Sequence, residues 1–271
     1  MDDSEPRKPN QSRTIVLCVF CNQRRPRAVE DVISNWIARE FDPVGAITTD
    51  FITAMPGEKV TQRTQQFGNL ATVKLKQVCE VCNSTWMSKI ENDTRPMLQP
   101  LLHGTQCQLS LAEQEQLTLW AQLKALSIDA YYLDTYRGFK YLPDRVFHEF
   151  AALRQPIEQS TVTLGRYRPP TQGVMLPWAR YLTNAPETDH TPSLDVLVAT
   201  FGFGELLLQV SIGAWHGESV HNAYSLVTPE MPQCWPLRDG PINWPTGHTT
   251  TPAGFRVVAS PIVLVTPVEF A

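Results

Sequence analysis

Cys18-Val19-Phe20-Cys21 opens the stretch of sequence that decides the fold, and Cys79-Glu80-Val81-Cys82 closes it. Each motif places two thiols three positions apart, and the 57 residues from 22 to 78 separate the two pairs. Four thiolates complete the tetrahedral shell of a zinc ion and leave no coordination position open for a substrate. The motifs therefore predict a structural Zn²⁺ held by Cys18, Cys21, Cys79 and Cys82, with reduced, unmetallated cysteines as the alternative.

The residues around the cysteine pairs predict strands and helices. Short runs at 15–17 and 73–78 lead into the two pairs and predict a strand before each. Apolar spacing predicts a helix over residues 29–41, and residues 42–68 are interpreted as loop and irregular hairpin. A second helix is expected to begin at Cys82 and to end at Pro96 and Pro100. One hydrophobic seam is expected from the apolar side chains of both helices, among them Trp36, Trp86, Met87 and Ile90.

The rest of the chain has sequence patterns typical of helices first and of strands afterwards. Ser110-Leu111-Ala112-Glu113 is a capping box and predicts a long amphipathic helix to about residue 128. A shorter helix is predicted over 144–154 and a β-hairpin around Gly202-Phe203-Gly204, followed by proline-rich loops at 228–252 and a last strand at 256–266. We therefore predict an α+β protein. Its parts are a disordered tail (1–13), a zinc-binding domain (14–100), a helical segment (101–160) and a β-rich carboxyl-terminal region (161–271).

The distribution of charged and apolar residues limits the partners and the compartment that we expect for this chain. The net charge is -4, but residues 1–91 hold 12 Lys and Arg against 11 Asp and Glu, whereas residues 92–271 hold 11 against 16. A phosphate-binding surface is therefore expected in the first third of the chain. The sequence has no apolar run of about 18 residues, so no membrane partner is expected. The first 13 residues lack the apolar core of a signal peptide, and C-x-x-C pairs suit a reducing compartment, so we expect a cytoplasmic protein.

The neighbours of the cysteines resemble a known family. Val29-Glu30-Asp31-Val32-Ile33-Ser34-Asn35-Trp36-Ile37 and Val78 to Met87, which reads V-C-x-x-C-N-x-x-W-M, are similar to the HNH endonucleases. The closest likeness is to a bacterial subgroup with a Glu-His-Val segment between its cysteine pairs, and it covers roughly residues 15–100. Trp235-Pro236 and Asn243-Trp244-Pro245 resemble the Trp-Pro-rich ends of the same subgroup. The resemblance implies a treble-clef zinc knuckle that supports a ββα-metal site.

The resemblance also implies roles for three polar residues. Glu30 matches the acidic residue that helps to hold a catalytic divalent ion, Mg²⁺ or Mn²⁺, and Asn83 matches the polar residue after the last cysteine. Asp31 stands where the family has its general base, a histidine, and Ser34 stands where the subgroup tends to have proline. A carboxylate with an ordinary pKa near 3.9 is a far weaker base than imidazole near 6.5, and losing a general base costs about 10² to 10⁴ in rate.

Three functional hypotheses follow from this departure. The chain is a degenerate HNH fold kept for nucleic-acid or metal binding, or a metal-dependent endonuclease that uses Glu30, Asp31 and Asn83, or an HNH fold diverted to other metal chemistry on a small molecule. Whether it is an enzyme stays open at this point. Glu30 and Asp31 are equally well interpreted as a charged first turn at a helix N-terminus.

Basic residues beside the cysteines point to a partner. DNA is the expected partner, gripped through its phosphates without sequence readout. A solvated loop explains the same charges. The candidate residues are Arg24, Arg25, Arg27, Lys74 and Lys76.

Overall fold

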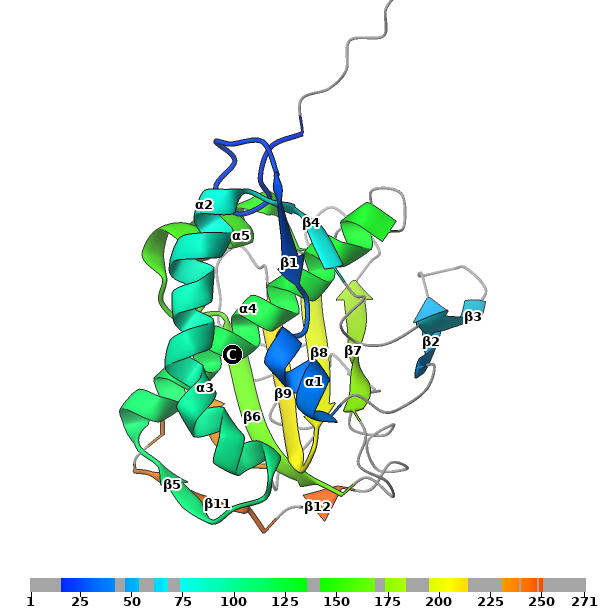
Figure 1. Ribbon diagram of the computed structural model, residues 1–271. Coiled ribbons are helices and arrows are strands. Elements are labelled where there is room, and N and C mark those ends of the chain that lie inside the picture. Colours follow the sequence, from blue (N-terminus) through cyan, green and yellow to red (C-terminus); the bar gives the residue numbers. More distant parts are fainter. Residues whose placement is uncertain are drawn as a thin grey trace, which may run out of the picture.

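The computed structural model describes residues 16–41, 47–53, 61–67, 74–135, 142–168, 174–183, 195–213, 231–238, 240–247 and 249–250 (Figure 1). This part of the chain mixes helices with sheets, as the sequence predicted. None of its helices is both long and apolar enough to cross a membrane. The predicted tail at 1–13 and the predicted last strand at 256–266 lie outside the described residues.

The segment before the first cysteine pair corrects one prediction. Val16 and Leu17 are exposed and belong to no strand. Two single backbone hydrogen bonds, and not a strand ladder, hold the chain here. The Cys18 N–H donates to the Arg24 carbonyl at 2.8 Å, and the Val19 N–H donates to the Gln77 carbonyl at 2.9 Å. Only the second cysteine pair follows a strand, β4 (Lys74–Val78).

The strand β1 (Ala28–Asp31) pairs antiparallel with β4, with Asp31 opposite Lys74. The helix α1 (Asn35–Phe41) begins only after Ser34, whose carbonyl accepts the Ile37 and Ala38 N–H groups. The helix predicted over 29–41 is therefore too long, because pairing with a strand more than 40 residues away overrides the local apolar spacing. The hairpin expected within 42–68 is present as β2 (Ile47–Thr53) and β3 (Thr61–Phe67).

Three helical pieces follow the second cysteine pair without a break: α2 (Glu80–Cys82), a π-helical turn η2 (Asn83–Met87) and α3 (Ser88–Leu102). The helix thus passes Pro96 and Pro100, and the prediction that these prolines end it is wrong. Each proline leaves the carbonyl four residues earlier without its N–H partner. The residues that carry these carbonyls, Asn92 and Pro96, are exposed to water, and buried Leu98, Leu101 and Leu102 hold the opposite face.

The long helix α4 (Leu111–Thr135) begins at the predicted capping box. The Ser110 hydroxyl and N–H both donate to the Glu113 carboxylate, at 2.7 and 2.8 Å, and the Glu113 N–H donates back to the Ser110 hydroxyl at 3.3 Å. The helix is amphipathic as predicted only in its first part: residues 111–120 mix exposed and buried positions, whereas every residue from 121 to 130 is buried. Burying a polar side chain in that second part is costly unless it finds a partner inside the protein.

Six of the described strands that follow α4 form a sheet behind it (Figure 1). α5 (Asp144–Leu153) precedes it, as predicted. The strand order is β10 (Gln233–Trp235), β6 (Ser160–Tyr167), β9 (Leu206–Gly213), β8 (Asp195–Phe203) and β7 (Val174–Thr183), with β12 (Thr249–Thr250) also on β6. β8 and β9 are the predicted hairpin. Separately, β5 (Cys107–Leu109) pairs with β11 (Ile242–Trp244).

One hydrophobic core joins the amino-terminal, helical and β-rich segments. Phe20, Leu98, Leu126, Phe147 and Val210 belong to a single cluster of buried residues. α4 contacts β4 and α3 as well as β7, β8, β9 and β10. The central helix is therefore the element through which the cysteine-containing segment and the sheet are held together.

Gly204, in the turn between β8 and β9, is a point of close contact between distant segments. Its φ of +53° lies in the left-handed region, and an added Cβ would lie 2.3 Å from the Leu102 carbonyl oxygen and 2.7 Å from the Phe41 ring. The next residue, Glu205, donates its N–H to the same carbonyl at 2.8 Å. Only glycine allows the hairpin to reach the end of α3 so closely.

We expect Gly204→Ala to lower the free energy of unfolding by about 2 kcal/mol or more, because the methyl group adds a backbone clash to a conformation that costs about 1–3 kcal/mol for other residues. Urea denaturation measures the loss. Gly247→Ala is the control, since its Cβ would meet nothing within 4 Å, and it should change stability by less than about 0.5 kcal/mol. Equal losses in both variants would contradict the close contact.

Candidate metal centre and its surroundings

The four predicted cysteine ligands converge in space. Their Sγ atoms all lie within 4.8 Å of one another, and the Cys21 and Cys79 sulfurs are 3.8 Å apart. All four are free thiols, three of them buried and Cys21 half-buried. Within the described ranges of the chain, no other three or more His, Cys, Asp or Glu side chains bring their ligand atoms together in this way. The cluster can therefore hold a metal ion.

Local backbone geometry aims the sulfurs inward. Asn22 takes a φ of +50°, which asparagine tolerates better than most residues, and its N–H donates to the Cys18 carbonyl at 2.8 Å. This closes the first turn. In the second pair, Cys79 caps α2, and the Cys82 N–H donates to the Cys79 sulfur at 3.4 Å.

The close approach of the thiols gives them different pKa values. The pKa of Cys18 is lowered to about 4, chiefly because the Cys82 thiol donates a hydrogen bond to its thiolate. The same bond, together with burial, raises the pKa of Cys82, and burial raises the pKa of Cys79. Without a cation the cluster therefore stabilises one thiolate and keeps neighbouring thiols protonated. A metal ion removes this conflict by neutralising all four thiolates.

Aromatic packing connects the cluster to the core. Phe20, between the first two cysteines, lies edge-on to Trp86 with ring centroids 5.4 Å apart and lies 5.7 Å from Phe147. Trp86 also meets Phe150 at 5.9 Å. The predicted seam is present in Trp86, Met87 and Ile90, which are buried, whereas Trp36 is half-buried.

The two candidate carboxylates of β1 do not converge. Glu30 is buried and faces α4, whereas Asp31 is half-exposed and forms an ion pair with Lys74 on the neighbouring strand. Successive side chains of a strand point to opposite faces, so this divergence follows from the strand that replaces the predicted helix. The structure thus excludes a charged first helical turn at these positions.

Lys124 of α4 is the partner of Glu30. Its side chain is fully buried, and its ammonium contacts the Glu30 carboxylate at 3.4 Å, the Asp31 carbonyl at 3.1 Å and the Glu91 carboxylate of α3. Burial alone would lower the pKa of Lys124, but the attraction of Glu91 and Glu30 outweighs it, so the pKa is raised. Burial also raises the pKa of Glu30, in spite of the lysine. Lys124 therefore carries a positive charge in the core.

Ser34 and Asn83 complete the neighbourhood. The Ser34 hydroxyl donates to Glu91 at 2.7 Å, which ties the start of α1 to α3. Asn83 lies half-buried in η2, where its carbonyl accepts the Ser88 hydroxyl at 2.7 Å. A π-helical turn often marks a functional position.

The predicted basic residues lie beside the cysteines. Arg24, Arg25, Arg27 and Lys76 are exposed and have no carboxylate partner within the residues that the structure describes. Lys74 differs, because Asp31 neutralises it. Within the described residues, these four cations are therefore left without a carboxylate partner.

Sequence reasoning missed Lys124 and Glu91. One signal was available: Lys124 stands between Leu123 and Ala125 in a helix whose neighbouring positions are mostly apolar, and a charge in such a helix needs an internal partner. No local pattern names the partner. Glu91 looked like an ordinary surface residue of a helix.

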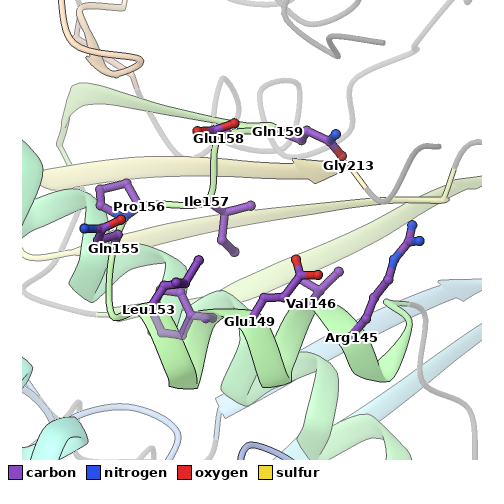
Figure 2. A pocket seen from close by; sticks show the side chains of 11 residues that line it. Arg145, Val146, Glu149, Leu153, Gln155, Pro156, Ile157, Glu158, Gln159 and Gly213 are labelled. Carbon is purple, nitrogen blue, oxygen red and sulfur yellow. The ribbon is translucent and has the colours of Figure 1, made fainter. Parts of the chain in front are cut away.

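Two hollows lie away from the cysteines. One, of about 430 Å³, runs along α5, where Figure 2 shows Val146 and Leu153 pointing toward Ile157 on the segment across, with Glu149 and Glu158 at the rim. The other, of about 470 Å³, lies between α1 and α3. Neither was predicted from the sequence.

Comparison of the chain with family models, with curated proteins and with solved structures gave no match.

We expect Lys124→Met to lower the free energy of unfolding by about 3–5 kcal/mol, because the neutral side chain leaves two carboxylates without their buried partner. Urea denaturation measures the loss. The matched control is Lys89→Met on the surface of α3, where the pair with Asp93 is exposed and should contribute less than about 1 kcal/mol.

The loss should also depend on pH. Removing Lys124 raises the pKa of Glu30 further, and a carboxyl with a raised pKa in the folded state favours folding at low pH and opposes it as pH rises through that pKa. The deficit of Lys124→Met should therefore be smaller at about pH 5 than at about pH 8. A deficit that is constant across this range would mean that the loss is one of packing and not of charge.

Proposed function

We propose that this chain is a zinc-stabilised nucleic-acid-binding protein, built on an HNH-like module in which a lysine replaces the catalytic divalent ion. The observation that carries the proposal is the buried ammonium of Lys124 against Glu30, the residue whose counterpart helps to hold a metal in the family that the sequence resembles. An ammonium and a divalent cation cannot occupy the same position. The degenerate form of the fold is therefore favoured over an endonuclease or a diverted metalloenzyme.

The order of the elements supports an HNH-like module. A cysteine turn precedes β1, β1 pairs with β4, and the second cysteine pair joins β4 to the helix that follows. This is the order of knuckle, hairpin and helix that the resemblance implies for a treble clef. The long connection between β1 and β4 contains α1 and the β2–β3 hairpin.

The chemistry of four thiolates and one printed sulfur–sulfur distance support zinc as the proposed metal. A tetrahedral site with Zn–S bonds of about 2.3 Å has sulfurs about 3.8 Å apart, and the Cys21 and Cys79 sulfurs are 3.8 Å apart. Four thiolates leave zinc no open position, so its contribution is to folding. The ion would stabilise the turn that carries Arg24 and Arg25.

The exposed cations supply the binding chemistry. Arg24, Arg25 and Arg27 lie in and just after the turn that begins at Cys18, and Lys76 lies on β4, which pairs with β1. Arginine donates up to five N–H bonds in a planar fork that matches phosphate oxygens. Contacts of this kind are to the backbone of nucleic acid and read no sequence.

We expect purified protein to contain one zinc ion per chain, measured by mass spectrometry of the metal. Cys79→Ser should lose the ion and unfold the protein, because structural zinc contributes on the order of 10 kcal/mol to folding. Cys107→Ser is the control, since Cys107 lies outside the cluster, and it should keep both zinc and fold. Well under one zinc per chain in the parent protein would overturn the assignment.

We expect the affinity for double-stranded DNA to fall about 10²-fold between about 50 and 200 mM salt, because four neutralised phosphates release their counterions. Arg25→Ala should reduce the slope of log K against log salt by about 1. Arg238→Ala, an exposed arginine beside β10 that contacts Gln233, is the control and should leave the slope unchanged. Fluorescence anisotropy measures both quantities.

The same DNA, incubated with Mg²⁺ or Mn²⁺, separates binding from catalysis. Neither the parent protein nor Asp31→His should cleave it, because in both the Lys124 ammonium still fills the position beside Glu30 that a metal ion would need. Efficient cleavage by the parent protein that is lost in Asp31→Ala would identify an endonuclease. Cleavage gained in Asp31→His would show that the metal site is intact, and either result would refute the lysine replacement.

A further inference from the structure

The hollow between α1 and α3 is lined by Asn35, Trp36, Arg39, Glu40 and Arg95. The four α1 residues form two pairs, Asn35 with Arg39 and Trp36 with Glu40. The members of each pair lie one helical turn apart, so all four share one face of the helix. Arg95 reaches the hollow from α3. The volume of about 470 Å³ lies within the range of about 300–1,000 Å³ found for small-molecule sites.

The charges of the hollow leave an excess of positive charge. Among its described lining residues Glu40 is the one carboxylate, and it contacts the His103 imidazole at 2.6 Å. Neither Arg39 nor Arg95 has a carboxylate partner in the part of the chain that the structure describes. Two guanidinium groups therefore face the same space as one described carboxylate, which leaves one positive charge in excess.

The two walls are held in place before any ligand arrives. The Ser34 hydroxyl, directly before α1, donates to Glu91 of α3 at 2.7 Å. Glu91 lies one helical turn before Arg95 and is itself held by buried Lys124. The Arg95 guanidinium lies over the Trp36 ring, with its carbon 5.1 Å from the ring centroid. This cation–π contact helps to hold Arg95 at the hollow before a ligand binds.

We propose that this hollow binds one nucleotide unit, with Arg39 and Arg95 on its phosphate and with Trp36 and Asn35 beside its base. Guanidinium forks match phosphate oxygens in bidentate geometry. An aromatic side chain and an amide suit the face and the polar edge of a base. The phosphate belongs either to a free nucleotide or to a single strand. The proposal extends the nucleic-acid binding proposed above to a second site, which does not depend on the arginines beside the cysteines.

Calorimetric titration tests the site with three probes at low salt: adenosine 5′-monophosphate, inorganic phosphate and a single strand of about ten nucleotides. Arg39→Gln is the main variant, because no described contact of the fold depends on Arg39, and thermal unfolding checks that it folds. It should weaken binding of the nucleotide or the strand by about tenfold or more. Arg238→Gln is the control and should leave binding unchanged. Inorganic phosphate should bind more weakly than the nucleotide, because it lacks a base.

The outcomes separate this site from the proposed DNA surface. Loss of both nucleotide and strand binding in Arg39→Gln supports a site open to free nucleotides, and loss of strand binding alone supports a site for strands. Either loss, with no effect of Arg25→Ala, keeps the hollow as a site and removes the DNA surface. Unchanged affinities in Arg39→Gln, or no binding of nucleotide and strand by the parent protein, overturn the site even if Arg25→Ala weakens DNA binding.

Discussion

The buried ammonium of Lys124 is the interaction on which the rest of the structure depends. A charge in the core is tolerated only when partners surround it, and removing one partner of such a group is far more costly than losing a surface pair. The partners of Lys124 come from β1 and α3, and Ser34 extends the same cluster to the start of α1. The cluster thus fixes β1, α3 and the start of α1 against the central helix α4, which also contacts the sheet.

The same ammonium decides how the site can be used. The resemblance to HNH endonucleases led us to expect Glu30 to be a metal-holding acid, but in the folded protein its carboxylate pairs with a lysine of α4. Asp31, its neighbour in the sequence, points to the other face of β1 and neutralises Lys74. In the described part of the chain, cations without a carboxylate partner lie in two places, beside the cysteine cluster and between α1 and α3. Both groups support the phosphate-bearing ligands that we propose.

Much of the local structure could be predicted, because its signals are local. The capping box at Ser110 and Glu113 marks the start of α4, the glycines around Phe203 mark the β8–β9 hairpin, and Pro143 precedes α5. The wrong predictions share a cause. The helix expected from Val29 is partly a strand because β4 supplies a partner, and α3 passes two prolines because buried leucines hold its other face. In both cases a contact with a distant segment outweighs a local preference.

For the candidate site, the sequence by itself determined which four cysteines come together and which basic residues lie exposed near them. Thiols three positions apart can meet at one ion within a single tight turn, and charges of a polar segment face water in almost any fold. Only the tertiary structure decided the partners of Glu30, Asp31 and Lys124 and the hollow at Trp36. Those partners lie up to 94 residues apart in the chain. No periodicity or spacing in the sequence predicts which of the many possible ion pairs will be buried together. That choice is made by packing, because the cost of burying a charge falls only where the fold brings its opposite within reach.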